Sequence, residues 1–201
     1  MPPKPWIRPF PPNEHLHFSP LRRTQDVKDS DGNTYRVFVQ NEEMSCGLAA
    51  ASMAIDLYRG QNTADSSAME TRLKHIAGQF PGSLEESDKL WAAGKDFGSL
   101  ASNIKATLNA QGVKVLLVSG PTGHPIPIDV TRLGKPAIIL WGWYPNGRNG
   151  NRNGGHFTVA ARLAKSGQIV ILDPWDGSLS EIAPGARYHG TGYADMVLYT
   201  A

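Results

Sequence analysis

Gln40-Asn41-Glu42-Glu43-Met44-Ser45-Cys46-Gly47 runs directly into Leu48-Ala49-Ala50-Ala51-Ser52-Met53-Ala54-Ile55, and this stretch decides the fold. The apolar run Tyr35–Val39 before it predicts a strand. The alanine-rich run from Cys46 to about Arg59, closed by Gly60, predicts a helix. Cys46 is the single cysteine of the chain and falls at the start of this helix. Unpaired N–H groups and the helix dipole there favour a thiolate over a thiol.

The composition is that of an ordinary soluble globular chain, long enough for one domain. Its 201 residues are 40% hydrophobic and 19% charged, as in typical globular proteins. The net charge of +2, from 20 basic and 18 acidic residues, gives no reason to expect nucleic acid or an anionic membrane as a partner. No apolar run approaches the roughly 18–20 residues of a membrane span. One cysteine excludes an internal disulfide. Scattered histidines offer no metal-ligand spacing, and we expect neither a metal nor a cofactor.

Residues 1–34 are expected to form a proline-rich arm and a turn, ahead of a single domain at 35–201. Prolines favour an extended arm over a helix, and they also stand where a signal peptide needs an apolar core. We therefore expect a protein that is cytoplasmic in the producing cell, with any export through a specialised secretion system. The first 20 residues contain seven prolines: Pro2, Pro3, Pro5, Pro9, Pro11, Pro12 and Pro20.

Helical patterns fill the first half of the domain, about 35–112, and strand patterns fill the second half, about 113–201. This segregation predicts an α+β fold with a mainly antiparallel sheet, on which the Cys46 helix packs. Besides that helix, the spacing of apolar residues predicts helices over about 64–77, 85–93 and 100–110. Strands are predicted over 113–118, 137–143, 157–163, 168–172 and 196–199, with a helical turn near 129–133.

His156 is the histidine best placed to serve the thiol. It opens a predicted strand directly after Gly154-Gly155, and a glycine at that point leaves room for another backbone or a substrate. A histidine at the mouth of a strand suits a general base for a thiol. The other five histidines lie in the proline-rich arm, in a predicted helix or in glycine-rich loops.

Asp173 ends the next strand and is the candidate that orients His156. If 164–167 is a four-residue hairpin loop, Leu163 pairs with Gln168, and Thr158 then opposes Asp173. His156 and Asp173 would lie on one face as diagonal neighbours, about 7–8 Å apart at the backbone. A three-residue loop would place them on opposite faces. Asp176 is a rival orienting residue, in the turn beyond the strand.

Further residues complete the candidate site. A developing oxyanion needs donors about 2.7–3.1 Å away, for which the Cys46 N–H and the Gln40 side chain are candidates. Gly155, Trp143 and Trp175 are candidate substrate-binding residues, and Trp175 could also shield the His–Asp pair from water. Trp141 and Trp143 alternate along the 137–143 strand, and we expect them to face opposite sides, one in the core and the other in the cleft.

The sequence resembles papain-fold cysteine peptidases, nearest to the bacterial double-glycine (bacteriocin-processing-like) peptidases and the papain-like effector proteases. Three short motifs over about residues 36–199 carry the resemblance: Gln40-x5-Cys46-Gly47, Gly155-His156-Phe157 and Leu172-Asp173-Pro174. The resemblance implies Cys46 as nucleophile, His156 as base and then acid, Asp173 as orienting residue and Gln40 in the oxyanion hole. The proline-rich arm and the 145–155 loop are not part of the family pattern.

The resemblance implies a cysteine peptidase that acts on a protein or peptide. It also suggests a bacterial secreted effector or toxin, with a delivery or inhibitor protein as a further partner. A deamidase or transglutaminase-like acyltransferase would use the same thiolate on another acceptor. A catalytically silent papain-like module that binds a partner through its cleft is a third hypothesis. Taken alone, a lone cysteine is more often a small buried hydrophobe than a nucleophile.

Overall fold

A computed structural model describes residues 24–40, 46–60, 101–120, 124–150, 152 and 154–201. Two α-helices, one 3₁₀ turn and eight strands lie in these ranges. They follow one another as β1 (Thr24–Lys28), β2 (Thr34–Phe38), α1 (Cys46–Arg59), α4 (Ala101–Ala110), β3 (Val115–Ser119), η1 (Val130–Arg132), β4 (Ala137–Trp143), β5 (Gly155–Leu163), β6 (Ile169–Asp173), β7 (Ser178–Ile182) and β8 (Gly192–Thr200). The described helices are all too short or too polar to cross a bilayer.

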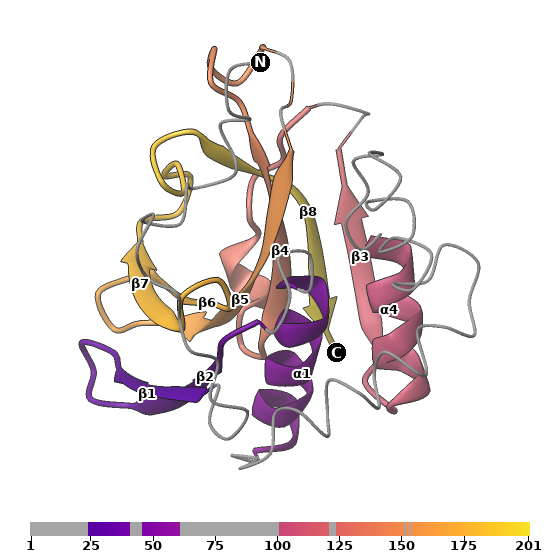
Figure 1. The fold of residues 1–201 in the computed structure, drawn as a ribbon, viewed down its shortest axis with the longest axis vertical. Helices are drawn as coiled ribbons and strands as arrows, with labels where there is room; N and C mark the ends of the chain where they lie inside the picture. Colours follow the sequence, from indigo (N-terminus) through magenta and orange to yellow (C-terminus); the bar gives the residue numbers. More distant parts are fainter. Residues whose placement is uncertain (1–23, 41–45, 61–100, 121–123, 151, 153) are drawn as a thin grey trace, which may run out of the picture.

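A six-stranded antiparallel sheet in the order β3-β8-β4-β5-β6-β7 forms the body of the fold. Helix α1 packs on β5 and β4, and α4 packs beside it on β3 (Figure 1). A separate hairpin, β1 with β2, contacts both α1 and β7. The α+β class with a mainly antiparallel sheet, predicted from the sequence, is confirmed.

Most of the predicted elements that fall within the described residues are present. Helix α1 has the predicted bounds, and α4, η1 and strands β2 to β6 lie within a few residues of their predicted positions. β8 is longer than predicted, and two strands were missed. β1 falls within the segment expected to be an arm and turn, and β7 follows the turn that comes after Asp173. The helices predicted over 64–77 and 85–93, and the proline arm over 1–20, lie outside the described residues.

The turn between β5 and β6 differs from the predicted four-residue loop. The Ala164 N–H donates to the Gln168 carbonyl at 2.8 Å, and Gly167 has a φ of +81°, which leaves a three-residue loop over 165–167. Next to this loop Leu163 pairs with Ile169, so the register is shifted by one residue from the prediction.

A β-bulge then restores the predicted register. Arg162 pairs with Val170, but Ala160 pairs with Ile171, so Ala161 is the extra residue on β5. Beyond the bulge Val159 pairs with Leu172, which is the pairing that the four-residue loop predicted. The bulge therefore brings the start of β5 opposite the end of β6 with the side chains on the predicted faces.

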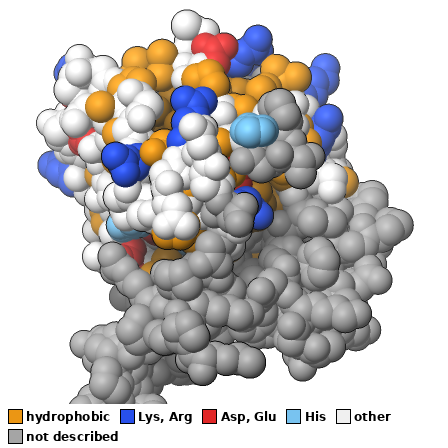
Figure 2. Space-filling view, turned by 90° about the horizontal axis from the view of Figure 1, so that it is seen from above, with side chains coloured by type: hydrophobic (Ala, Val, Ile, Leu, Met, Phe, Trp, Pro, Cys, Tyr) orange, Lys and Arg blue, Asp and Glu red, His pale blue; other side chains and the backbone are white. Residues whose placement is uncertain are grey.

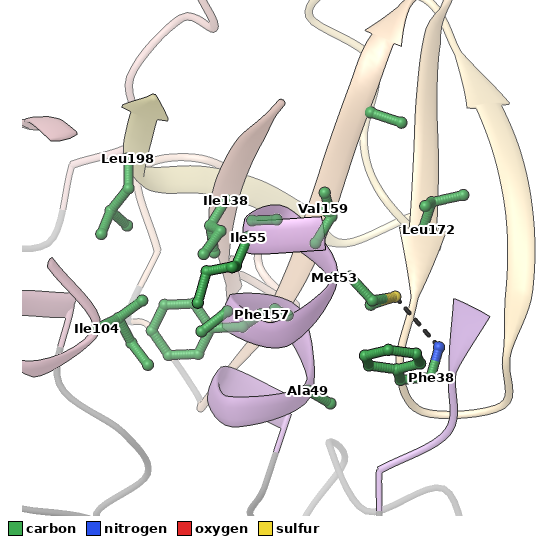
Figure 3. Close-up of a cluster of buried hydrophobic side chains, with 14 of the residues drawn as sticks. Phe38, Ala49, Met53, Ile55, Ile104, Ile138, Phe157, Val159, Leu172 and Leu198 are labelled. Atoms are coloured by element: carbon green, nitrogen blue, oxygen red, sulfur yellow. Dashed lines mark hydrogen bonds between the residues drawn. The ribbon is translucent and has the colours of Figure 1, made fainter. Parts of the chain in front are cut away.

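Helix α1 is buried on nearly all sides because its residues are small and apolar. Every residue from Gly47 to Asp56 is buried, and four alanines in this run allow close approach to the sheet. Figure 3 shows Ile55 among side chains of the sheet, Phe157 and Ile138, and of α4, Ile104. The Phe38 N–H also contacts the Met53 sulfur at 3.3 Å. This packing fixes the N-terminal end of α1, and with it Cys46, against β2 and the sheet.

A buried ionic cluster ties the β1–β2 hairpin to the main sheet. The Asp29 carboxylate accepts bonds from Arg162 Nη2 at 2.7 Å, from the Tyr35 hydroxyl at 2.9 Å and from the Asn33 N–H at 2.8 Å. Asp31 receives a further bond from the same guanidinium. Although burial raises the pKa of Asp29, these donors outweigh it and hold the pKa well below its usual range. The hairpin that leads to Gln40 is thus anchored by one arginine.

Replacing Arg162 with glutamine is expected to lower the free energy of unfolding by about 3 kcal/mol, because the buried Asp29 carboxylate loses its cation. Arg36→Gln is the matched control, since its ion pair with Asp26 is exposed and should contribute little. Because Asp29 has a depressed pKa in the folded state, its contribution is fully present above the unfolded pKa of about 4 and is lost progressively as pH falls from there towards the folded pKa. Urea unfolding of both variants at pH 7 and pH 2 measures this. Equal losses at the two pH values, or equal losses for the two variants, would contradict it.

Candidate active site

Cys46 is the first residue of α1 and is half-buried. Its backbone N–H therefore belongs to the first turn of the helix, where N–H groups have no partner within the helix. The residues that follow it, Gly47 to Asp56, are all buried, so Cys46 lies half-buried at the N-terminal end of this enclosed stretch. This is the position that the alanine-rich pattern predicted.

His156 and Asp173 form a short, buried contact. His156 Nε2 lies 2.7 Å from Asp173 Oδ1, and the two residues are 8% and 3% exposed. Cys46 lies close enough to the imidazole to be among the groups that raise its pKa. Because Nε2 contacts Asp173, Nδ1 is the ring nitrogen available to the sulfur. The structure thus brings together three of the four residues predicted to be catalytic, with the imidazole between the thiol and the carboxylate.

The electrostatics of this site favour a charged imidazole. Burial lowers the pKa of His156, but the Asp173 carboxylate and the Cys46 side chain outweigh it and raise the pKa to about 10. Burial likewise raises the pKa of Asp173, and the charge and hydrogen bond of His156 overcome this, so that the pKa is strongly lowered. At neutral pH a charged imidazolium therefore contacts the Asp173 carboxylate and lies near the Cys46 side chain.

Two more side chains reach Asp173, and sequence reasoning missed both. The Tyr188 hydroxyl donates to Asp173 Oδ2 at 2.5 Å, and His189 Nε2 lies 3.7 Å from the same oxygen. The Trp175 N–H donates to Oδ1 at 2.8 Å. Asp176, the rival orienting residue, is exposed and accepts from the Ser178 N–H instead. The only sequence signal for these additional partners of Asp173 was the pair Tyr188-His189 in a glycine-rich turn.

Gln40 lies beside the turn that follows Asp173. Its N–H donates to the Pro174 carbonyl at 2.7 Å, and the residue is 7% exposed. Gly177 in the same turn has no room for a Cβ, which would lie 2.9 Å from a Val39 methyl group. The end of β2 is therefore pinned to the β6–β7 turn. Residues 41–45, which connect Gln40 to Cys46, lie outside the described residues.

The three residues predicted to bind substrate have different surroundings. The half-buried Trp175 ring meets His156 edge-on, with centroids 6.2 Å apart and planes at 87°. At Gly155, a Cβ would lie 2.5 Å from an Arg152 nitrogen and 2.9 Å from the Trp141 carbonyl oxygen. The room at this glycine is thus taken by the neighbouring strand and by Arg152.

The prediction that Trp141 and Trp143 face opposite sides of β4 is wrong. Residues two apart in a strand share a face, and both rings stack on Tyr188, with centroids 4.9 and 6.4 Å away. Both belong to the hydrophobic cluster on the face of the sheet away from α1. Trp143 therefore supports the turn that carries Tyr188.

A second polar cluster, formed by Asp195, Arg152 and Tyr144, lies where β4 ends and β5 and β8 begin. Asp195 is the extra residue of a β-bulge in β8, where the register shifts between Leu140 and Trp141. Its carboxylate lies 2.5 Å from Arg152 Nε and accepts from the Tyr144 hydroxyl at 2.6 Å. Arg152 is therefore neutralised rather than a free loop cation. Figure 2 shows Lys and Arg side chains spread among hydrophobic ones over the described part of this end of the molecule.

Within the described part of the chain, no cluster of three or more histidine, cysteine or acidic side chains could hold a metal ion. The polar groups around Cys46 instead bond to one another.

Comparison with known proteins gives matches among solved structures but none by sequence. No family model matches the sequence, and no curated protein matches it either. Among solved structures, the peptidase domain of Streptococcus ComA, a bi-functional ABC transporter involved in a quorum sensing pathway, superposes with a TM-score of 0.48 and 14% sequence identity. The match covers 81% of this chain and 95% of that domain.

Proposed function

We propose that this protein is a cysteine peptidase that cleaves peptide bonds with Cys46 as nucleophile, His156 as acid and base, and Asp173 as orienting residue. The observation that carries the proposal is the buried His156–Asp173 contact at 2.7 Å, with Cys46 close enough to the imidazole to contribute to its raised pKa. A nucleophile, a base and a group that orients the base, all within hydrogen-bond reach, are the requirements of covalent acyl transfer.

The proposed reaction begins from the thiolate–imidazolium pair. The Cys46 sulfur attacks the peptide carbonyl carbon, a C–S bond forms, and the oxyanion is held by the Cys46 N–H and the Gln40 side-chain amide. The intermediate collapses as the C–N bond breaks, and His156 gives its proton to the leaving nitrogen. Neutral His156 then takes a proton from water, which attacks the thioester. The C–S bond breaks, and the acid product and the thiolate are released.

The broader proposal is a papain-like arrangement, in which α1 carries the nucleophile and the strands carry its base. It is supported by the chain order Gln40, Cys46, His156, Asp173 and by the packing of α1 on β5. The same resemblance also suggests the biological role of the peptidase. We propose that it acts as a bacterial effector or toxin.

The test is digestion of a proteome-derived peptide library, followed by mass spectrometry of the products. Because Cys46 is the only cysteine, protein pretreated with iodoacetamide is a matched inactive control. New peptide termini produced only by the untreated protein support the peptidase. Ammonia release with mass gains of glutamine deamidation and no new termini would select the deamidase instead. A library unchanged in both respects would contradict thiol-dependent acyl transfer.

A further inference from the structure

The Asp173 carboxylate divides its partners between its two oxygens. Oδ1 faces His156 Nε2 at 2.7 Å and accepts the Trp175 N–H at 2.8 Å. Oδ2 accepts the Tyr188 hydroxyl at 2.5 Å and has His189 Nε2 at 3.7 Å. A carboxylate that contacted His156 alone would be free to rotate about its side-chain bonds. The hydrogen bond from Tyr188 to the second oxygen fixes the plane of the carboxylate, and so fixes where Oδ1 points.

The turn that supplies these two side chains is built rigidly. Tyr188 and Gly192 exchange both backbone bonds, at 2.8 and 2.7 Å, which closes a three-residue turn over 189–191. His189 has a φ of +45°, in the left-handed region that few non-glycine residues adopt apart from asparagine, aspartate and histidine. This conformation brings the His189 ring against the Tyr188 ring, with centroids 4.2 Å apart, so that both side chains reach one carboxylate oxygen.

The Tyr188 ring is itself held by the strand that pairs with His156. It is 1% exposed and lies parallel to Trp141, with ring planes at 17°. Trp141 is the direct cross-strand partner of His156 in the pairing of β4 with β5. The hydroxyl is therefore fixed relative to the same part of the sheet that fixes the imidazole.

We propose that Tyr188, assisted by His189, is a positioning residue of the Cys46–His156–Asp173 site. Its hydroxyl holds Asp173 Oδ2 so that Oδ1 keeps the His156 ring directed at the thiol. The proposal deepens the proposed peptidase function and rests on it. Neither residue touches the reacting sulfur; both act through Asp173.

The test is the rate of Cys46 alkylation by iodoacetamide at pH 6 and pH 9.5, followed by intact-mass spectrometry, in the wild type and in Tyr188→Phe. Phenylalanine keeps the ring on Trp141 and removes only the hydroxyl. We expect the ratio of the pH 6 rate to the pH 9.5 rate to fall about tenfold, because a misaligned imidazolium stabilises the thiolate less. Tyr193→Phe, whose ring packs edge-on to Tyr144 in the same hairpin, should leave the ratio unchanged.

The outcomes separate the two proposals. If the wild-type protein alkylates rapidly at pH 6 and Tyr188→Phe matches it, the positioning role is wrong and the proposed function stands. If the wild type itself alkylates like a free cysteine, both fail. Should Tyr188→Phe not fold, His189→Asn tests the same carboxylate, because asparagine tolerates the left-handed conformation. We expect this variant to lower the ratio about twofold, and an unchanged ratio would overturn the proposal.

Discussion

Replacing Cys46 with alanine is expected to abolish peptide cleavage completely while leaving the fold intact. The Cys46 sulfur is the atom that forms the acyl-enzyme. No other described side chain of the site can form that bond in its place. The loss of activity should therefore reach the detection limit of the assay, at least about 10³-fold. Cys46 is only half-buried at the helix start, so removing its sulfur leaves no large cavity, and the midpoint of urea unfolding should change little.

The measurement is cleavage of the peptide library by the variant at the same concentration as the wild type. Ser52→Ala is a useful control, because it also removes one side-chain heteroatom from α1, where the hydroxyl bonds the Leu48 carbonyl. This control should cleave at nearly the wild-type rate. Full activity in Cys46→Ala would exclude covalent catalysis by this residue.

Replacing His156 with glutamine is expected to lower peptide cleavage about 10²- to 10⁴-fold, the usual contribution of a general acid–base group. Glutamine can still donate to Asp173, so that the buried carboxylate keeps a partner, but it has no proton to exchange at neutral pH. Loss of the imidazolium should also slow Cys46 alkylation at pH 6 about 10²-fold, because the thiolate loses its neighbouring cation.

His124→Gln is the matched control for that variant, since His124 is an exposed histidine in another loop. It should leave both rates unchanged. Equal alkylation rates at pH 6 for His156→Gln and the wild type would show that the ring does not act on the thiol. Loss of both activities together with loss of folding would be detected by the unfolding midpoint, and cleavage would then be compared in His156→Asn.

The residues around Cys46 were predictable because their pattern is strong. Small and apolar residues at helical spacing gave the bounds of α1, and the order of Cys46, His156 and Asp173 suggested their meeting. The contact between His156 and Asp173 was nevertheless predicted correctly only because two differences from the prediction cancel. The loop has three residues rather than four, which shifts the register by one, and the bulge at Ala161 shifts it back. A bulge leaves no clear mark in the hydrophobic pattern, so its compensation could not be foreseen.

The missed elements have weak sequence signals for physical reasons. β7 is an edge strand whose five residues are all half-buried, so it lacks the alternation of a strand with one buried face. Tyr188 lies between glycine-rich turns, and its bond to Asp173 joins residues 15 apart in sequence. Only the folded pairing of its turn with Gly192 aims its hydroxyl at the carboxylate.

The central claim is that Cys46 is held as a nucleophilic thiolate by the buried His156 and Asp173. The most direct test is the pH dependence of Cys46 alkylation in the wild-type protein between pH 4.5 and pH 9.5, which reports one site because the chain has one cysteine. A rate that is already near its plateau at pH 6 is the predicted result. A rate that stays low at pH 6 and rises about tenfold per pH unit towards the pKa of about 8.5 of a free thiol would contradict the claim.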